Sequence, residues 1–294
     1  IILSTEILIQ KSDNTMGGII WLASYPKSGN TWVRTFLHNL LLNANRPADL
    51  NELTKFTIGD GNKIWYEQVT GKPFDSFSDE EVAALVPRVH QAYARTRPDS
   101  VFVKTHNWLG TAHGVPLITP DFTAGAVYIV RNPLDVVISL SDHYGMPIDQ
   151  GVEMMTDVEA YSAETDRKLP DYLSSWSNHV TSWQAMEKSR RHIMRYEDML
   201  YKPEQTFGAL AKFLGLKPPK ERLRRAIKFS SFDASRKQED EKGFNERSDK
   251  AEKFFRVGKA GQWKTTLSPD QVAKIVTAHR DVMKEFKYLP PGYK

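Results

Sequence analysis

The sequence predicts an α/β fold in which a parallel β-sheet is covered by helices on both faces. Short runs rich in β-branched and aromatic residues, such as GIIWLAS, SVFVKT and GAVYIV, alternate with segments of helical periodicity. This alternation is typical of parallel strands joined by crossover helices. The chain has 294 residues, and we find neither an internal repeat nor a clear linker in it. We therefore expect a single domain over residues 18–294, preceded by an extension or tag-like stretch at 1–17.

The first half of the chain predicts three strands and three helices. Residues 17–26 predict a strand, and 30–42 predict the helix that follows it, because apolar residues recur there every three or four positions. Residues 78–96 predict a helix with Ser78 as its cap. The segments 100–106 and 125–133 predict two further strands. A helix should then run over 133–144, because Pro133 suits its first turn and Gly145 its end.

The second half predicts mostly helices. Helical periodicity covers 171–188, 203–215 and 268–286, while 192–200 predicts a strand. The stretch 233–253 is highly charged and has few apolar residues, so we expect a mobile loop there.

Composition narrows the class of function. The chain has no cysteine, which excludes disulfides, thiolate zinc sites and thiol nucleophiles, and which agrees with a reducing compartment. A net charge of +4 suits an anionic ligand but is not the concentrated basic face of a nucleic-acid binder. No apolar run reaches the ~20 residues of a membrane span. We expect a cytoplasmic protein without a nucleic-acid partner.

The stretch SYPKSGNTW, residues 24–32, joins the first strand to the first helix and predicts a phosphate-binding loop of the P-loop type. Backbone N–H groups and the helix dipole attract anions at such a junction. Gly29 permits close approach of the backbone, and Lys27 adds a full charge. The usual order GxxxxGK[ST] is absent, because this lysine precedes the glycine. An ordinary strand-to-helix turn with an exposed lysine is the alternative interpretation.

A second candidate is the string RNPLDVVIS at the end of the strand 125–133. Arg131 follows the strand, and Ser139 lies about two helical turns into the next helix. A guanidinium fork and a hydroxyl together suit a phosphate at the carboxyl edge of a parallel sheet. Equally, Arg131 could pair with Asp135 while Ser139 only packs.

Two more strings carry candidate residues. In VFVKTHNW, Lys104 and His106 alternate along a strand and therefore point to the same side, while Thr105 points away. A histidine at this edge suits a general base, although a lone histidine is more often structural. In RVGKAGQWK, residues 256–264, two glycines and basic residues suit a backbone nest for an anion, or else an ordinary basic turn.

Taken together, these strings resemble the cytosolic-type sulfotransferase family, in the family's order and over most of the chain. SYPKSGNTW is similar to the family's YPKSGTTW, RNPLDVVIS to RNxxDxxxS, KTH to the segment with the catalytic histidine, and RVGKAGQWK to RKGxxGDWK. The segments YED and SSF resemble those on the adenine side. The resemblance implies transfer of a sulfuryl group from 3′-phosphoadenosine 5′-phosphosulfate (PAPS), with adenosine 3′,5′-bisphosphate (PAP) as product and no required metal.

The resemblance also implies roles for individual residues. His106 is expected as the general base, with Lys27 on the leaving phosphate and Lys104 at the sulfuryl group as further catalytic residues. The expected donor-binding residues are Lys27, Ser28, Gly29, Asn30, Thr31, Trp32, Arg131, Ser139, Tyr196, Ser230, Phe232, Arg256, Val257 and Gly258. Asn30, Val257 and Gln262 depart from the family strings.

The acceptor and the oligomeric state are left open by the sequence. We expect a small-molecule acceptor with a hydroxyl or amine, and Trp65, Tyr66, Phe74, Trp108 and Tyr144 are candidates for an apolar acceptor pocket. The family's dimer motif KxxxTVxxxE has no match after Trp263, so a dimer of that type is not supported.

Two rival functions stay in view. A P-loop nucleotide kinase or NTPase needs a hydroxyl directly after its lysine and a carboxylate for magnesium at a strand end. Ser28 meets the first condition, but the strand ends carry His106 and Arg131 instead of a carboxylate. A non-enzymatic nucleotide or RNA binder would give a histidine base no task.

Overall fold

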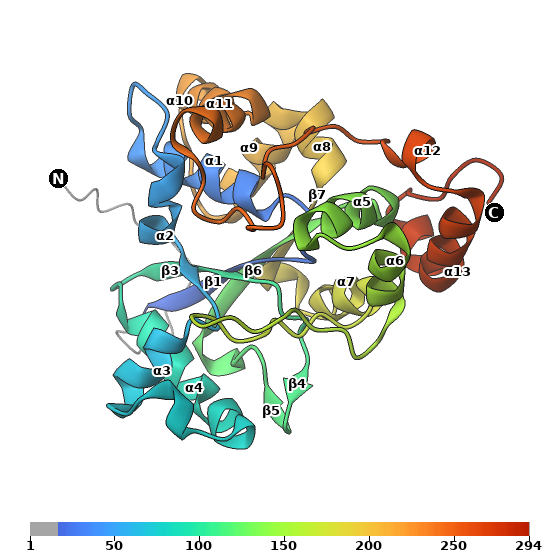
Figure 1. Cartoon of the computed structure of the whole chain (residues 1–294). Helices are drawn as coiled ribbons and strands as arrows, with labels where there is room; N and C mark the ends of the chain where they lie inside the picture. The colour runs from blue at the N-terminus through green and yellow to red at the C-terminus, as the bar shows by residue number, and fades with distance from the viewer. Residues whose placement is uncertain (1–16, 294) are drawn as a thin grey trace.

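A five-stranded parallel sheet forms the centre of the molecule in the computed structural model, which describes residues 17–293 (Figure 1). The strands lie in the order β2-β3-β1-β6-β7, and every adjacent pair is parallel. Their bounds are Gly18–Ser24 for β1, Ile58–Gly59 for β2, Ser100–Thr105 for β3, Thr123–Val130 for β6 and Arg191–Arg195 for β7. A short antiparallel pair, β4 (Thr111–Ala112) and β5 (Val115–Pro116), lies outside this sheet. The predicted α/β fold is confirmed.

Helices cover both faces of the sheet. On one face, the upper one in Figure 1, lie α1 (Asn30–Leu42), α2 (Leu53–Phe56), α8 (Tyr196–Tyr201), α9 (Pro203–Phe213), α10 (Lys220–Phe229) and α11 (Phe232–Lys242). The remaining helices are α3 (Lys63–Thr70), α4 (Asp79–Arg95), α5 (Pro133–Tyr144), α6 (Ile148–Thr156), α7 (Trp176–Gln184), α12 (Trp263–Thr266) and α13 (Pro269–Glu285).

Two apolar cores result, because successive side chains of β1 point to opposite faces of the sheet. Ile19 and Trp21 pack into the core that α4, α5, α7 and α13 share, whereas Ile20 and Leu22 pack into the core under α1 and α9. All four side chains are at most 1% exposed. The glycine pair and β-branched run of the sequence therefore form a strand that is buried on both sides, as expected for a central parallel strand.

Only the second half of the stretch 233–253 is the loop that the sequence predicted. Residues 233–242 belong to α11, and residues 243–253 contain no helix or strand. The Ser231 side chain caps the helix by accepting from the Ala234 N–H. Ion pairs four residues apart, Arg236 with Asp240 among them, then join neighbouring turns. Over residues 233–242, the charged side chains that predicted a loop instead form the solvated face of a short helix.

Two boundaries were also wrong. The strand predicted over 192–200 ends at Arg195, and α8 begins at the next residue. The helix predicted over 171–188 is limited to α7, because the Ser175 side chain caps its start by accepting from the Asn178 N–H. The extension predicted at 1–17 lies almost wholly outside the described residues.

Candidate active site

A cavity of about 660 Å³ opens at the carboxyl ends of β1, β3 and β6. All sequence-predicted catalytic and donor-binding residues line it except Ser28, which is fully buried within the loop. They come from the first loop and the start of α1, the ends of β3 and β6, α5, the starts of α8 and α11, and the segment after Phe255. Residues up to 231 positions apart thus meet at the edge where parallel α/β sheets bind ligands.

The loop between β1 and α1 has the geometry of an anion cradle. Gly29 has φ +105°, and a Cβ there would lie 2.8 Å from the Tyr196 ring, so a larger residue would be strained and obstructed. No side chain caps the first turn of α1. Ser28 is fully buried, and its Oγ has no hydrogen-bond partner among residues 17–293. Uncapped N–H groups and an unpaired hydroxyl at one helix start fit an anionic group.

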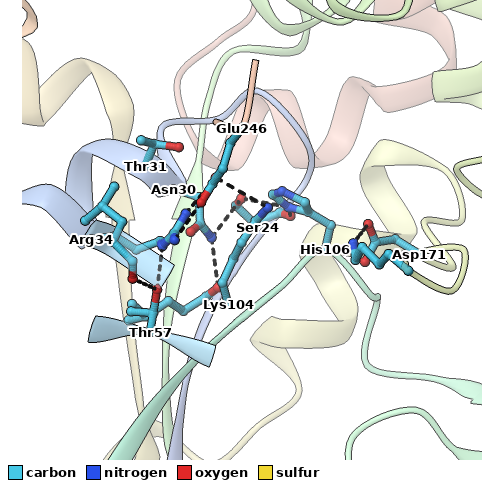
Figure 2. A network of polar contacts seen from close by, with 12 residues as sticks. Ser24, Asn30, Thr31, Arg34, Thr57, Lys104, His106, Asp171 and Glu246 are labelled. Carbon is cyan, nitrogen blue, oxygen red and sulfur yellow. Dashed lines mark hydrogen bonds and ion pairs between the residues drawn. The ribbon is translucent and has the colours of Figure 1, made fainter. Parts of the chain in front are cut away.

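Asn30, which departs from the family string, fastens this loop to the sheet. Its Nδ2 donates to the Leu22 carbonyl at 2.8 Å and lies 3.4 Å from the Ser24 Oγ (Figure 2). Among residues 17–293 its Oδ1 has no partner, although the residue is buried and lines the cavity. An amide oxygen only accepts, so this atom suits a donor group of a ligand and not a phosphate oxygen.

Arg131 connects the loop to the last glycine-rich segment. Its Nη1 donates to the Lys27 carbonyl at 2.8 Å and its Nη2 to the Lys259 carbonyl at 3.4 Å. The guanidinium lies 4.3 Å from the centre of the Tyr196 ring. The Nε has no partner in the described part of the chain, although Arg131 is only 6% exposed. The guanidinium, which lies over the Tyr196 ring, can therefore donate its Nε–H to one more acceptor, such as a phosphate oxygen.

Asp135 does not pair with Arg131, which was the alternative that the sequence left open. Its two carboxylate oxygens accept the backbone N–H groups of Gly261, at 2.7 Å, and of Trp263, at 3.2 Å. This carboxylate holds the segment 256–264 against α5, one turn before Ser139 on the cavity wall. No pattern in the sequence predicts this role, which Asp135 serves from a position that is 2% exposed.

Gly258 and Phe232 form the other side of the cavity. Gly258 has φ +65°, and a Cβ there would lie 2.3 Å from the Phe232 ring, so only glycine fits. Nearby, the Arg256 guanidinium pairs with Asp142 at 3.5 Å. Trp32 packs edge-on against Tyr196, with ring centres 5.8 Å apart. Flat rings beside basic groups suit a purine and its phosphates.

His106 has one ring nitrogen fixed and the other available. Its Nδ1 lies 2.8 Å from the Ser24 carbonyl, which only accepts, so Nδ1 carries the hydrogen (Figure 2). Burial lowers the pKa of the imidazole well below its ordinary value, and the nearby Lys104 ammonium lowers it further. The ring is therefore neutral at neutral pH, and its Nε2, at the cavity wall, carries no hydrogen.

Both candidate lysines are held by the segment that follows α11. The Lys27 Nζ lies 4.0 Å from the centre of the Phe254 ring, and the Lys104 Nζ lies 4.0 Å from a Glu246 oxygen. Burial lowers the pKa of each lysine to about 8, and for Lys27 the Arg131 charge adds to the effect. As predicted, Lys104 and His106 face one side of β3, whereas the Thr105 hydroxyl turns away from the cavity.

Arg34 and Glu246 are site residues that the sequence analysis missed. Arg34 is 2% exposed and grips the Glu246 carboxylate with two N–H groups at 2.8 and 2.9 Å (Figure 2). Burial opposes ionisation of Glu246, but the Arg34 and Lys104 charges lower its pKa to about 2. Since the two residues are 212 positions apart, no local pattern announces the pair.

The five aromatic residues considered for the acceptor are not brought together. Tyr144 lines the main cavity, whereas Tyr66 and Phe74 line a second cavity of about 330 Å³. Trp65 packs edge-on against Tyr93, and Trp108 lines neither cavity. The main cavity instead places an ion pair near His106, formed by Lys168 and the buried Asp171 (Figure 2 labels Asp171). Despite burial, this lysine lowers the pKa of Asp171.

Residues 17–293 contain neither a metal-binding cluster nor a membrane-spanning helix. No cluster of three or more His, Asp or Glu side chains there is placed to hold a metal ion. None of the helices in this part of the chain is long and apolar enough to cross a membrane.

Proteins of known family are similar to this chain in sequence. The sulfotransferase domain family matches residues 19–287. Cytosolic sulfotransferase 1 of Arabidopsis thaliana is 24% identical over 87% of this chain and 76% of its own length. Sulfotransferase 1A1 of Canis lupus familiaris is 26% identical over 85% of this chain and 78% of its own.

Solved structures share the fold. A retinol dehydratase in complex with retinol and PAP superposes with a TM-score of 0.65 at 22% identity, covering 93% of this chain and 83% of that one. A mouse sulfotransferase complexed with PAP gives a TM-score of 0.59 at 18% identity, covering 92% and 85%. These identities make the likeness one of architecture.

Proposed function

The chain belongs to the sulfotransferase family and is a sulfotransferase, and we propose that it moves the sulfuryl group of PAPS to a hydroxyl or amine of a small-molecule acceptor. Within this proposal, His106 is the general base and the cavity above the β1–α1 loop is the donor site. The observation that carries them is a neutral histidine, with Nε2 free, beside an anion cradle. PAP appears in the names of two structural relatives.

The donor site is proposed from unpaired polar groups. The uncapped start of α1, the Ser28 hydroxyl and Lys27 suit the 5′-phosphate and the sulfate, with Asn30 and Thr31 beside them. Arg131 offers its free Nε to the 3′-phosphate, and Ser139 offers its hydroxyl from the same wall. Arg256, Val257 and Gly258 would close over that phosphate, while Trp32, Tyr196, Ser230 and Phe232 would enclose the adenine.

The chain's own groups account for the proton and the charge. The Nε2 of His106 would accept the acceptor's proton while the acceptor oxygen forms a bond to sulfur. As the bond from sulfur to the leaving phosphate breaks, negative charge grows on that phosphate, where Lys27 and the α1 N–H groups would stabilise it. Lys104, 4.0 Å from Glu246, would turn to the sulfuryl oxygens. None of these steps needs a metal ion, and we propose that none is required.

The acceptor side is proposed more coarsely. Tyr144, Lys168 and Asp171 line the cavity near His106 and give it both an apolar and a polar wall. These groups suit a small molecule that presents one hydroxyl or amine to Nε2. By analogy with the cytosolic relatives, we place the protein in the cytoplasm.

Calorimetry tests the donor site. We expect PAP to bind and ATP with Mg²⁺ to bind at least tenfold more weakly. The site offers the Arg131 Nε to a 3′-phosphate, and Asp60, the carboxylate that directly follows β2, does not line the cavity where it could hold magnesium. The opposite preference would favour a P-loop kinase or NTPase. Turnover of ³⁵S-labelled PAPS with a panel of phenols, alcohols and amines then identifies the acceptor class, and binding of PAP without turnover of any would favour a non-enzymatic nucleotide binder.

A further inference from the structure

Asp60 is a buried carboxylate that lies outside the donor site and contacts the segment carrying His106. The residue follows β2 and is 5% exposed. Its Oδ2 accepts the Thr105 hydroxyl at 2.9 Å and the Asn107 Nδ2 at 3.1 Å. Its backbone N–H donates to the Lys104 carbonyl at 2.9 Å. One residue therefore binds the positions immediately before and after the proposed base.

Neutral donors satisfy the charge of Asp60. Its Oδ1 accepts the Gly61 N–H at 3.0 Å and lies 3.4 Å from the His90 Nε2. The Thr119 N–H donates to the His90 Nδ1, so the hydrogen of that ring is on Nε2, facing Asp60. Among residues 17–293, no lysine or arginine nitrogen lies within 4.0 Å of the carboxylate. A carboxylate that is buried without a cationic partner costs stability unless all its lone pairs are used.

The same short segment is fixed again from α7. The His179 Nε2 donates to the His106 carbonyl at 3.0 Å, and the Trp183 Nε1 donates to the Asn107 carbonyl at 3.1 Å. The Asn107 side chain also accepts the Tyr172 N–H, at 2.7 Å. With Nδ1 of His106 bound to Ser24, the backbone and the ring of the proposed base have few remaining degrees of freedom.

We propose that Asp60 is a positioning residue for the transfer reaction. By binding Thr105 and Asn107, it sets the direction in which the Nε2 of His106 points. This inference rests on the proposed role of His106. Asp60 lines the second cavity and not the donor cavity, so its action on the reaction would pass through those two neighbours. Displacing a catalytic group by roughly 1 Å costs on the order of 100-fold in rate.

The central test is Asp60→Asn, with the exposed Asp121→Asn as matched control. The new amide presents an N–H₂ group in place of one oxygen. At the Oδ2 position Thr105 and Asn107 lose their acceptor, and at the Oδ1 position Gly61 and His90 lose theirs. We expect kcat per PAP-binding site to fall roughly 10- to 100-fold with the best acceptor of the screen, while the PAP dissociation constant changes less than about threefold. The control should leave both quantities unchanged.

A second pair of variants covers the case in which Asp60→Asn does not fold. Thr105→Val removes the hydroxyl at constant size, and Thr105→Ser keeps it. We expect the valine variant to lose about tenfold or more in kcat and the serine variant to stay within about threefold of the parent, at similar PAP affinity. A purely packing role for Thr105 would give the reverse order, because serine leaves a cavity where valine does not.

An NMR readout needs no acceptor. Nitrogen spectra of the histidine rings should show His106 protonated on Nδ1 in the parent protein, and a shifted or tautomerically mixed ring in Asp60→Asn. Unchanged His106 resonances, together with kcat per PAP site within twofold of the parent, would overturn the positioning role. If the parent ring is instead protonated on Nε2, the general-base assignment fails, and that failure is distinct from a failure of Asp60.

Discussion

Replacing Arg131 by lysine should separate recognition of the 3′-phosphate from recognition of the rest of the nucleotide. Arg131 donates one N–H to the Lys27 carbonyl and another to the Lys259 carbonyl. Its Nε is buried and has no partner among residues 17–293. Lysine keeps the charge but not the planar fork, so it cannot hold both carbonyls and also reach a phosphate. At least one charge-assisted hydrogen bond to the ligand should be lost.

The expected cost follows from that count. One charge-assisted hydrogen bond contributes about 1.5–3 kcal/mol, which corresponds to roughly 10- to 150-fold in affinity. Calorimetry should therefore show PAP affinity reduced by that factor in Arg131→Lys, and affinity for 5′-AMP, which lacks the 3′-phosphate, reduced less than about threefold.

The matched control is Arg195→Lys. Arg195 lies 4.7 Å from the Tyr288 ring, much as Arg131 lies over Tyr196, but it does not line the cavity. Its replacement should leave both affinities unchanged. If Arg131→Lys weakens PAP and 5′-AMP by the same factor, the lysine variant has only disturbed the loop around Lys27, and the assignment of a 3′-phosphate site to Arg131 is wrong.

Two further predictions concern the proposed base and Lys27. His106→Ala should reduce kcat by a factor on the order of 100 to 10,000 while PAP binding persists, because a base acts on the acceptor's proton; the exposed His113→Ala is the control, and near-normal turnover of the His106 variant would disprove the role. PAP affinity should weaken as the pH rises from about 7 to about 9, because Lys27, whose pKa is about 8 and which is assigned to the 5′-phosphate, loses its positive charge over that range. An affinity that is constant across this range would contradict the assignment of Lys27 to that phosphate.

The sequence determined the central strands and most of the residues that line the main cavity, because both depend on local patterns. A β-branched run between glycines and SYPKSG predicts β1, and the periodicity of residues 30–42 predicts α1. The Pro133 start and the Gly145 end of α5 were likewise readable, since both residues restrict the backbone where they stand. Motifs at strand ends also fixed which residues would meet, since the carboxyl ends of parallel strands share one edge.

The sequence alone did not predict α11, because its residues show no pattern of apolar side chains. The charged stretch 233–253 lacks an apolar face of its own, and α11 is held by contacts that no short pattern contains. The buried Glu239 carboxylate accepts the N–H groups of Phe254 and Phe255, about 15 residues later. Helix, turn and returning segment depend on one another there, so single-segment reasoning gave a loop.

Only the tertiary structure decided which atoms of the site are free and which are already used. Arg131 precedes α5 and Asp135 lies in its first turn, four residues later, yet each binds backbone groups of the segment 256–264 instead of the other. The tautomer of His106 depends on a carbonyl 82 positions away, and Asp60 reaches Thr105 and Asn107 only because β2 pairs with β3. Residue types limit which hydrogen bonds can form, but the packing of distant segments sets which partners come within 3 Å and which groups remain for a ligand.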